Sequence, residues 1–348
     1  MLREIGGRRI GGNASVFVIA EIGLNHGGSL DRALEMVDAA AWAGASAVKL
    51  QTIFADRLVA DSCPAPAHVE SSSLRDFFAT FELDAEAHRA LVQRARERGL
   101  AVLSTPFCES AVDLLESLEI DAYKIASGDI TYDGLIRKVA TTGRPVVMST
   151  GMSALVEVGR AVEIARTAGA RDIAALHCVS AYPTPAASQN LRAIVTLADY
   201  LRMPVGLSDH SRGVHAGIAA VALGACIYER HLVLEHDDDA IDRAVSSTPT
   251  QLRKQIAGLE EIRAALGTGR KVCQPAERAN VVPSRRGLYT TRAIRAGEMI
   301  TADDVAVLRP ATSVPPSAFG MIVGSRASRD IAAGDPFMPH DVAVEQAS

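Results

Sequence analysis

A regular alternation of short apolar segments with amphipathic helical segments constrains the fold of this chain more than any other feature. Eight such strand–helix units follow one another between residues 16 and 266. The apolar segments are continuous, as in strands buried on both faces of a parallel sheet. The expected strands are 16–22, 47–50, 101–104, 122–125, 145–148, 173–176, 204–207 and 225–228. This order predicts an α/β fold, a (β/α)8 TIM barrel over residues 1–266.

A doubly wound open sheet is the alternative fold. The chain has no Gly-x-Gly-x-x-Gly turn after any expected strand, which favours the barrel. Ser29 is expected to cap a first helix over 30–43. The connection 52–80 is too long for a plain loop, so we expect it to be functional.

The pattern changes after residue 266. Residues 267–284 contain Gly, Pro, Lys and Arg without periodicity, which indicates a linker. Residues 285–348 hold short apolar segments joined by glycine turns and predict a small β-rich domain, with strands that include 288–291, 305–308 and 321–324. The pieces 294–298 and 331–335 resemble each other and indicate an internal repeat.

Composition excludes several kinds of partner. With 36 basic and 41 acidic residues the net charge is −5, so we expect neither nucleic acid nor a membrane surface as partner. No apolar run is long enough to span a membrane, and the N-terminal residues lack the apolar segment of a signal peptide. The five cysteines are odd in number and widely spaced, which indicates a reducing compartment. A cytoplasmic protein is expected.

Polar side chains follow the expected strands, and in a barrel these strand ends share one mouth. Lys49 and Lys124 are expected to anchor a phosphate or carboxylate or to act as a Schiff-base nucleophile; solvated lysines are the alternative. The hydroxyl side chains are equally consistent with a phosphate cradle and with caps of the following helices. The polar residues at the strand ends are Glu21, Lys49, Gln51, Ser104, Thr105, Lys124, Ser127, Ser149, Thr150, His177, Ser208, Asp209, His210, Glu229 and His231.

Two histidines at these strand ends are candidate metal ligands. His210 and His231 are 21 residues apart, which is one strand–helix step of a barrel. Two imidazoles on neighbouring strand ends can hold one divalent metal ion, whereas His177 is equally consistent with a core position. Asp242 is a further candidate for reaching the mouth. The residues together predict a metal-assisted enzyme that acts on an anionic, phosphorylated small molecule.

Nine motifs, in order along the chain, resemble those of the sialic acid synthase family. They are Ala20-Glu-Ile-Gly-Leu-Asn-His26, Val48-Lys-Leu-Gln-Thr52, Ser104-Thr-Pro-Phe107, Tyr123-Lys-Ile-Ala-Ser-Gly-Asp129, Ser149-Thr-Gly-Met152, Leu176-His-Cys178, Tyr182-Pro-Thr-Pro185, Gly206-Leu-Ser-Asp-His210 and Glu229-Arg-His231. Residues 285–310 resemble the antifreeze-like (SAF, β-clip) domain at the C-terminus of that family. The resemblance implies a catalytic barrel followed by a SAF domain over 285–348.

The resemblance also implies an activity. Phosphoenolpyruvate would condense with an N-acylated hexosamine, either N-acetylmannosamine or a diacetamido-dideoxy hexose, to give a sialic-acid-type nonulosonate and phosphate. A divalent metal, Mn²⁺ with Mg²⁺ or Co²⁺ as alternatives, would lie on His210 and His231 and polarise the sugar aldehyde. Glu21 would be a base or would position water. Phosphoenolpyruvate would be held by Lys49, Thr105, Lys124, Ser127, Ser149 and Ser208, and the sugar by Gln51, Tyr182, Asp242 and Arg309.

The family resemblance further implies a domain-swapped homodimer, in which the SAF domain caps the barrel of the partner and Arg309 reaches the N-acyl group. Three departures from the family pattern are Asp129 in place of glutamate, Ser180 in place of asparagine, and 311–313 in place of a glycine pattern. We expect them on the acceptor side of the site. The alternative functions are a Schiff-base pyruvate aldolase that uses Lys124 and a non-catalytic carbohydrate- or surface-binding protein.

Overall fold

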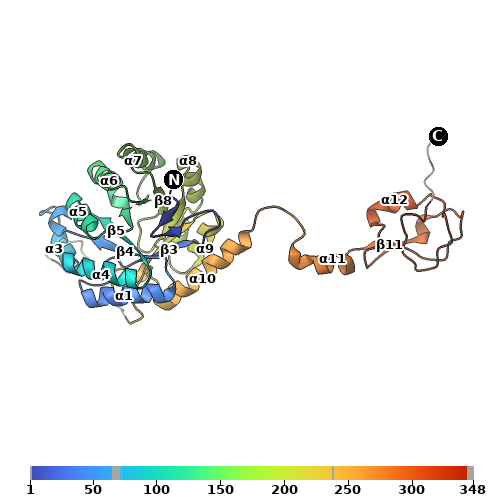
Figure 1. Cartoon of the computed structure of the whole chain (residues 1–348), viewed down its shortest axis with the longest axis horizontal. Helices are drawn as coiled ribbons and strands as arrows, with labels where there is room; N and C mark the ends of the chain where they lie inside the picture. Colours follow the sequence, from blue (N-terminus) through green and yellow to red (C-terminus); the bar gives the residue numbers. More distant parts are fainter. Residues whose placement is uncertain (1, 65–70, 72, 237–238, 343–348) are drawn as a thin grey trace. The chain divides into compact units, whose positions relative to one another are not determined.

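The computed structural model describes residues 2–64, 71, 73–236 and 239–342. The chain forms two compact units, Met1–Gly267 and Thr268–Ser348. In the first unit eight parallel strands close into a barrel in the order β10-β3-β4-β5-β6-β7-β8-β9, as the alternation predicted (Figure 1). The strands are β3 (Phe17–Glu21), β4 (Ala47–Thr52), β5 (Ala101–Pro106), β6 (Ala122–Ile125), β7 (Val146–Ser149), β8 (Ile173–Cys178), β9 (Val205–Asp209) and β10 (Ile227–His231).

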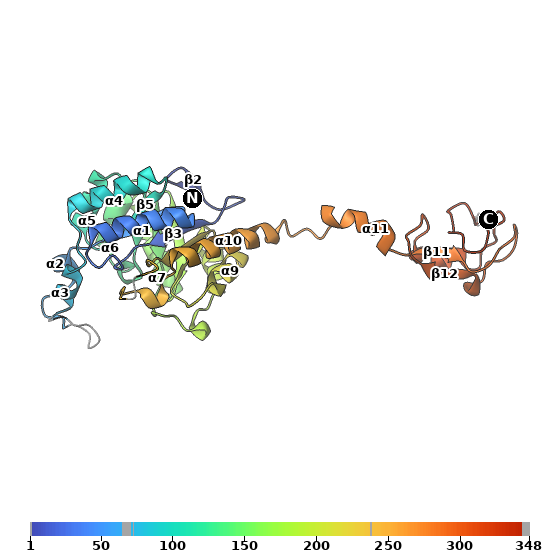
Figure 2. The ribbon, with the colours of Figure 1, turned by 90° about the horizontal axis from the view of Figure 1, so that it is seen from below.

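Eight main helices surround the strands. They are α1 (Leu30–Ala43), α4 (Ala85–Glu97), α5 (Glu109–Ser117), α6 (Asp133–Thr141), α7 (Leu155–Thr167), α8 (Ala193–Leu201), α9 (His215–Ala222) and α10 (Pro249–Leu266). Helix α1 lies between α4 and α10 (Figure 2). Its bounds confirm the prediction: the Ser29 side chain accepts a hydrogen bond from the Arg32 amide, and Gly44 ends the helix with a φ of 88°. No helix in the described part of the chain is long and apolar enough to cross a membrane.

Apolar side chains seal the end of the barrel at which the strands begin. A short hairpin of β1 (Glu4–Ile5) and β2 (Arg8–Arg9) precedes the barrel. Leu2, Ile5 and Ile10 from this segment belong to one buried cluster with side chains of the strands, such as Phe17 and Ile227. We call this cluster the barrel floor. The opposite end, where the strands finish, is the mouth.

The long connection between β4 and α4 carries two short helices, α2 (Ala55–Leu58) and α3 (Leu74–Ala79). Ser73 caps α3 by accepting a hydrogen bond from the Asp76 amide. Part of the connection that we predicted to be functional, 65–70 and 72, lies outside the described residues. Because the connection leaves the carboxyl end of β4, its helices stand at the mouth.

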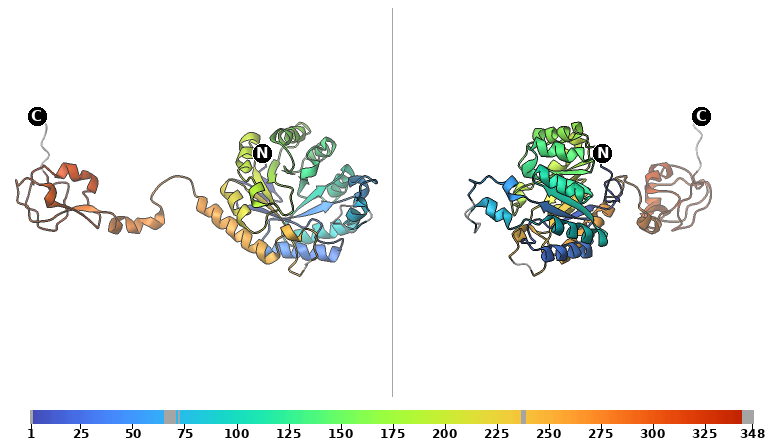
Figure 3. Two further views of the ribbon diagram at one scale, coloured as in Figure 1. Left: turned by 180° about the vertical axis from the view of Figure 1, so that it is seen from behind. Right: turned by 60° about the vertical axis from the view of Figure 1, so that its left-hand side comes forward.

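The second unit is built from short strands and turns with little helix (Figure 3). It contains α11 (Arg278–Ser284), the antiparallel pair β11 (Gly287–Thr290) and β12 (Val305–Leu308), and α12 (Phe319–Ile322). Helix α11 lies within the segment 267–284 for which the sequence indicated a linker. The strand expected at 321–324 is wrong: Ile322 is buried as part of α12, because a short apolar run does not by itself distinguish helix from strand.

The internal repeat in the second unit is confirmed by two matching sets of contacts. Ile294 and Ile331 pair across an antiparallel bridge. In the first copy Arg292 Nε donates to Asp304 Oδ1 at 2.6 Å, and in the second Arg329 Nε donates to Asp341 Oδ1 at 2.6 Å. Each aspartate is buried and also accepts a hydrogen bond from a backbone amide three residues before it.

Candidate active site

The register of the barrel strands brings polar side chains level with one another at the mouth. On neighbouring strands His231 lies opposite Glu21, and Glu21 lies opposite Lys49. On the other side of β10, Glu229 lies opposite Ser208 of β9. Strands β9 and β10 approach closely because Gly206 has no side chain: a Cβ there would lie 2.3 Å from the carbonyl oxygen of Ile227.

A cavity of about 380 Å³ opens at this mouth. Thirteen of the fifteen residues predicted from the sequence line it, while Asp129 and Arg309 are not among the lining residues. The thirteen are Glu21, Lys49, Gln51, Thr105, Lys124, Ser127, Ser149, Ser180, Tyr182, Ser208, His210, His231 and Asp242. A barrel mouth with this set of charged and hydroxyl groups is suited to bind an anionic substrate.

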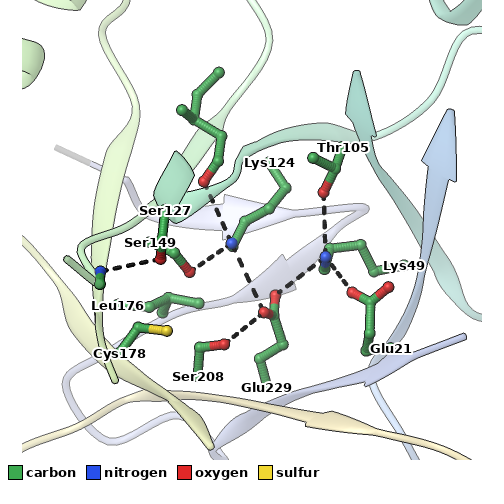
Figure 4. A network of polar contacts seen from close by, with 12 residues as sticks. Glu21, Lys49, Thr105, Lys124, Ser127, Ser149, Leu176, Cys178, Ser208 and Glu229 are labelled. Carbon is green, nitrogen blue, oxygen red and sulfur yellow. Dashed lines mark hydrogen bonds and ion pairs between the residues drawn. The ribbon is translucent and has the colours of Figure 1, made fainter. Parts of the chain in front are cut away.

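The carboxylate of Glu229 lies between the two buried lysines (Figure 4). Its Oε2 is 3.9 Å from Lys49 Nζ, and its Oε1 is 3.7 Å from Lys124 Nζ. Ser208 Oγ donates to Oε1 at 2.8 Å. Lys49 is also paired directly with Glu21. The two ammonium groups are thus held around one central carboxylate.

These contacts shift the pKa values of the charged groups in different directions. Burial lowers the pKa of Lys49, but the carboxylates of Glu21 and Glu229 outweigh burial and the net shift is upward. Burial also lowers the pKa of Lys124, and its net shift is downward because Glu229 compensates only in part. Burial raises the pKa of Glu229, but the two lysines outweigh it and bring it to about 2. Glu229 is therefore ionised at neutral pH, and Lys124 loses its proton more readily than Lys49.

Hydroxyl groups surround the two ammonium groups. Lys49 Nζ donates to Thr105 Oγ1 at 3.1 Å, and Lys124 Nζ donates to Ser149 Oγ at 2.5 Å. Ser127 Oγ accepts a hydrogen bond from the Gly151 amide at 3.0 Å (Figure 4). We call the two lysines with Thr105, Ser127, Ser149 and Ser208 the polar cradle. Its donors converge as those of a phosphate or carboxylate site do.

The two candidate metal ligands lie side by side next to the cradle. The ring centroids of His210 and His231 are 5.4 Å apart. His210 Nδ1 is 3.1 Å from the carbonyl oxygen of Val179, and His231 Nδ1 is 3.2 Å from Asp242 Oδ2. Tyr182 stacks on His210 with 4.1 Å between the ring centroids. Each imidazole therefore has an oxygen acceptor beside one nitrogen, the arrangement that orients metal-binding histidines.

A buried ion pair lies next to both histidines along the chain. Arg230 precedes His231, Asp209 precedes His210, and the guanidinium Nη1 is 3.2 Å from Asp209 Oδ2. Arg230 also donates to the carbonyl oxygens of Asp209 and Ser211. Tyr228 donates its hydroxyl proton to the same aspartate at 2.9 Å. This network ties the carboxyl ends of β9 and β10 together.

Three predicted residues need separate description, because Asp129 and Arg309 do not line the cavity and Ser180 lies near the polar cradle. Ser180 lies near Ser127 of the polar cradle, since a Cβ on Gly151 would lie 2.3 Å from Ser180 Oγ and 2.8 Å from Ser127 Oγ, and its place on the acceptor side stays a prediction. Asp129 is partly buried, its Oδ2 has no hydrogen-bond partner, and burial raises its pKa to about 6 against the effect of Lys124. Arg309 belongs to the second unit.

Sequence reasoning gave no role to several residues that line the pocket. Glu229 stood among the polar strand ends, and it precedes His231 by two residues, so both side chains point to the same face of β10. This alternation of side chains along the strand is the sequence signal that could have placed Glu229 at the site. The other residues are apolar or small, and their approach depends on loops whose path no periodicity predicts; they are Leu24, Leu58, Phe78, Phe107, Ala126, Gly128, Met152 and Cys178.

The sequence and the fold match one family over nearly the whole chain. The model of the NeuB family matches residues 36–271, and that of the SAF domain matches residues 285–343. The N,N'-diacetyllegionaminic acid synthase of Campylobacter jejuni is 33% identical over 90% of this chain and 96% of its own length. Human N-acetylneuraminate-9-phosphate synthase is 29% identical over 95% of this chain and 94% of its own.

The crystal structure of a sialic acid synthetase from Leptospira borgpetersenii superposes with a TM-score of 0.73, is 34% identical, and covers 80% of this chain and 94% of that one. The relatives named as synthases match both the barrel and the C-terminal unit, in the same order. The chain is therefore an enzyme that belongs to the NeuB family and ends in a SAF domain.

Proposed function

We propose that this enzyme condenses phosphoenolpyruvate with an N-acylated hexosamine to form a sialic-acid-type nonulosonate and inorganic phosphate. The observation that carries the proposal is the polar cradle, with two buried lysines around Glu229, in the same pocket as the pair His210 and His231. The cradle suits the phosphate and carboxylate of the donor, and the histidines suit the aldehyde end of the acceptor.

The proposed reaction forms one carbon–carbon bond and breaks one carbon–oxygen bond. C3 of phosphoenolpyruvate attacks the aldehyde carbon of the open-chain sugar, water adds at C2, and phosphate leaves by cleavage of its bond to C2. Glu21 is the proposed base or water-positioning group, since its carboxylate is held by Lys49 and by Gln51, whose Nε2 donates to Oε1 at 3.2 Å. Lys49 and Lys124 neutralise the negative charge of the donor and of the departing phosphate.

The residues at the mouth fit a divalent metal ion. Val179 and Asp242 orient the two imidazoles, which leaves one nitrogen of each ring as a potential ligand. Within the described residues no group of three or more His, Cys, Asp or Glu side chains is arranged to hold a metal, so water or substrate atoms would complete the coordination. Mn²⁺, with Mg²⁺ or Co²⁺ as alternatives, would supply Lewis-acid polarisation of the aldehyde.

The acceptor is the less defined substrate. Tyr182, Gln51 and Asp242, which line the pocket, are its proposed contacts, and Asp129 is a further proposed contact. Ser180 is proposed to bind substrate beside the cradle. We also propose a domain-swapped homodimer in which Arg309 reaches the N-acyl group from the partner's SAF domain. All five cysteines are free thiols, which supports a cytoplasmic enzyme.

A direct assay tests the proposal. The full chain is incubated with Mn²⁺, phosphoenolpyruvate and a panel of N-acylated hexosamines, and released phosphate and product mass are measured. We expect one acceptor to release phosphate and to yield the mass of the condensed acid. With phosphoenolpyruvate labelled by ¹⁸O in the bridging position, the label should leave with the phosphate. If no sugar of the panel leads to phosphate release, the proposal is contradicted.

A Schiff-base aldolase is the second candidate, because the lowered pKa of Lys124 favours a nucleophilic amine. Borohydride reduction in the presence of pyruvate separates the two reactions. The proposed condensation forms no imine, so the mass of the protein should stay unchanged. A mass increase that maps to Lys124 would support the aldolase.

A further inference from the structure

One buried amide lies behind the candidate metal site. Asn25 follows β3, is 1% exposed and does not line the pocket. Strand β3 is the neighbour of β10 in the barrel, so the loop that holds Asn25 lies beside the segment that follows His231. An amide that is buried to this degree needs hydrogen-bond partners within the protein. Its partners therefore show which part of the mouth Asn25 holds in place.

The side chain of Asn25 bridges two positions of the segment after β10. Nδ2 donates to the carbonyl oxygen of Leu232 at 2.7 Å and to Ser246 Oγ at 2.9 Å. Oδ1 accepts a hydrogen bond from the backbone amide of Asp242 at 2.9 Å. Ser246 Oγ in turn donates to the carbonyl oxygen of Asp242 at 2.7 Å. The two backbone polar groups of Asp242 are therefore held by a network whose centre is the Asn25 amide.

Asp242 carries this constraint to the imidazole of His231. Its Oδ2 is 3.2 Å from Nδ1 of the ring. A carboxylate beside Nδ1 leaves Nε2 as the potential metal ligand. Asp242 belongs to no strand or α-helix and directly precedes the short 3₁₀ helix η3 (Arg243–Val245). Hydrogen bonds, rather than regular secondary structure, must therefore fix the position of its carboxylate.

The turn that carries Asn25 is itself fixed against the end of β3. The backbone amide of Asn25 donates to the carbonyl oxygen of Ile22 at 3.1 Å. Gly23 lies inside this turn with a φ of 55°, and a Cβ there would lie 3.3 Å from His231 Nδ1 and 3.1 Å from Glu21 Oε1. The absence of a side chain at this position lets the turn pass close to the imidazole. Asn25 is thus anchored on the barrel, while Asp242 is anchored on Asn25.

The hydrogen bonds of the Asn25 side chain reach the histidine side of the pocket and not the donor side. Both amide hydrogens and the carbonyl oxygen are used within the segment 232–246. Within the described residues, none of these hydrogen bonds goes to the polar cradle, which is built from β4, β5, β6, β7 and β9 and the residues that follow them. Loss of the amide should therefore affect the two sides of the pocket differently.

We propose that Asn25 is a positioning residue for the metal ion, an inference that rests on the metal-dependent reaction of the proposed function. Asn25 fixes the backbone of Asp242, and the carboxylate of Asp242 orients the ring of His231. Asn25 itself touches neither the metal ion nor a substrate. Its loss lets the carboxylate move away from Nδ1, so that the ring binds a metal ion less well. Phosphoenolpyruvate binding does not depend on it.

Binding of Mn²⁺ and of phosphoenolpyruvate, each measured alone, tests the inference. Electron paramagnetic resonance gives the Mn²⁺ affinity, and titration calorimetry gives the phosphoenolpyruvate affinity of the metal-free protein. Asn25→Ala should weaken Mn²⁺ binding by about 10-fold and leave phosphoenolpyruvate binding unchanged. Ser246→Ala removes one arm of the network and should weaken Mn²⁺ binding by less. Ser29→Ala is the control, because it removes the N-cap of α1 from the same loop and should change neither affinity.

A double-mutant cycle separates positioning from a general loss of stability. Asp242→Ala removes the carboxylate through which Asn25 acts. On that background Asn25→Ala should change the Mn²⁺ affinity by less than about 2-fold. If Asn25→Ala does not fold, Ser246→Ala takes its place in the same cycle.

The outcomes distinguish the inference from the proposed function. Equal losses of Mn²⁺ affinity on both backgrounds, or a parallel loss of phosphoenolpyruvate affinity, would show that the amide stabilises the mouth as a whole, and the inference would be wrong. Full Mn²⁺ affinity in the Asn25→Ala variant would overturn the inference and leave the proposed function standing. An unchanged chain that binds no Mn²⁺ would overturn the proposed metal site and the inference with it.

Discussion

The two ends of the barrel bury very different side chains. At the floor, Leu2, Ile5 and Ile10 pack on the beginnings of the strands in a cluster without charged groups. At the mouth, Lys49, Lys124 and Glu229 are as deeply buried, each at 5% exposure or less. Burial of an apolar group stabilises the fold, whereas burial of three charges costs free energy that their mutual attraction offsets only in part. The floor therefore serves stability, and the mouth holds groups that a folded barrel does not need.

Removal of the central carboxylate should have the largest effect. Glu229→Gln keeps the shape of the side chain but leaves Lys124 without an anionic partner and Lys49 with Glu21 alone. We expect turnover to fall by about 100- to 1,000-fold. The free energy of unfolding should fall by about 3 kcal/mol, because a buried charge is left uncompensated. Steady-state kinetics and urea denaturation measure the two effects.

Glu260→Gln is the control for Glu229→Gln, because it makes the same substitution near the floor. Glu260 of α10 accepts a hydrogen bond from the amide of Val16, just before β3, and pairs with Arg263 at 2.9 Å. Turnover of the folded protein should stay at the level of the unchanged chain. Equal losses of turnover in both variants would contradict the division of roles between the two ends.

Truncation of a floor side chain should lower stability without lowering turnover. Ile5 is 1% exposed, and Ile5→Ala leaves a cavity at the floor. We expect the free energy of unfolding to fall by about 3 kcal/mol. Turnover at a temperature at which the variant is folded should be unchanged. The neighbouring exposed residue gives the control: Glu4→Ala should alter neither quantity.

The two ends also differ in how far the sequence alone predicts them. The strands, the ring of helices and the shared mouth follow from the alternation of apolar and amphipathic segments, because each strand must be covered on both faces. The bounds of α1 follow from Ser29 and Gly44. The polar strand ends follow in the same way, since a parallel barrel gathers all of them at one end.

The sequence alone does not predict contacts that depend on side-chain length and on the paths of loops. The place of Glu229 between two lysines is set by the stagger of β4, β6 and β10, which no periodicity specifies. Leu58 and Phe78 reach the pocket from α2 and α3, which are too short to give a helical pattern. The approach of Ser180 to Ser127 depends on Gly151, a residue from a different strand–helix unit, and no sequence pattern predicts it.

The next largest effect should come from replacement of Arg230, the buried arginine that precedes His231. Arg230→Lys keeps the charge but loses a guanidinium that donates from Nη1 to the carbonyl oxygens of Asp209 and Ser211 and from Nε to Ser247 Oγ, so β9 and β10 should hold His210 and His231 less well. We expect the affinity for Mn²⁺, measured by electron paramagnetic resonance without substrate, to fall by about 10-fold. Arg144→Lys is the counterpart at the beginning of β7, where Arg144 binds Glu116 and the carbonyl oxygen of Ile120. An equal change of Mn²⁺ affinity in both variants would show that the effect is not specific to the mouth.

The smallest effect should be a dependence of stability on pH that arises at the mouth. His26 follows β3, and burial, helped by His88 and Arg32, lowers its pKa to about 4. Below pH 6.5 the unfolded chain binds a proton there that the folded chain does not bind until about pH 4, so stability falls as the pH falls through this window. The slope due to this histidine should be at most about 1.4 kcal/mol per pH unit.

His26→Gln should make that slope shallower in urea denaturation between pH 4.5 and 7.5. His215→Gln, which changes an exposed histidine of α9, should leave the slope as it is. The protection of amide hydrogens, taken relative to the intrinsic exchange rate at each pH, should fall first in the loop after β3 and not in the hairpin of the floor, because the apolar cluster there has no histidine or carboxylate to protonate. Earlier loss of protection at the floor than at the mouth would mean that acid acts on the barrel as a whole, and that the charged mouth is not its weaker end.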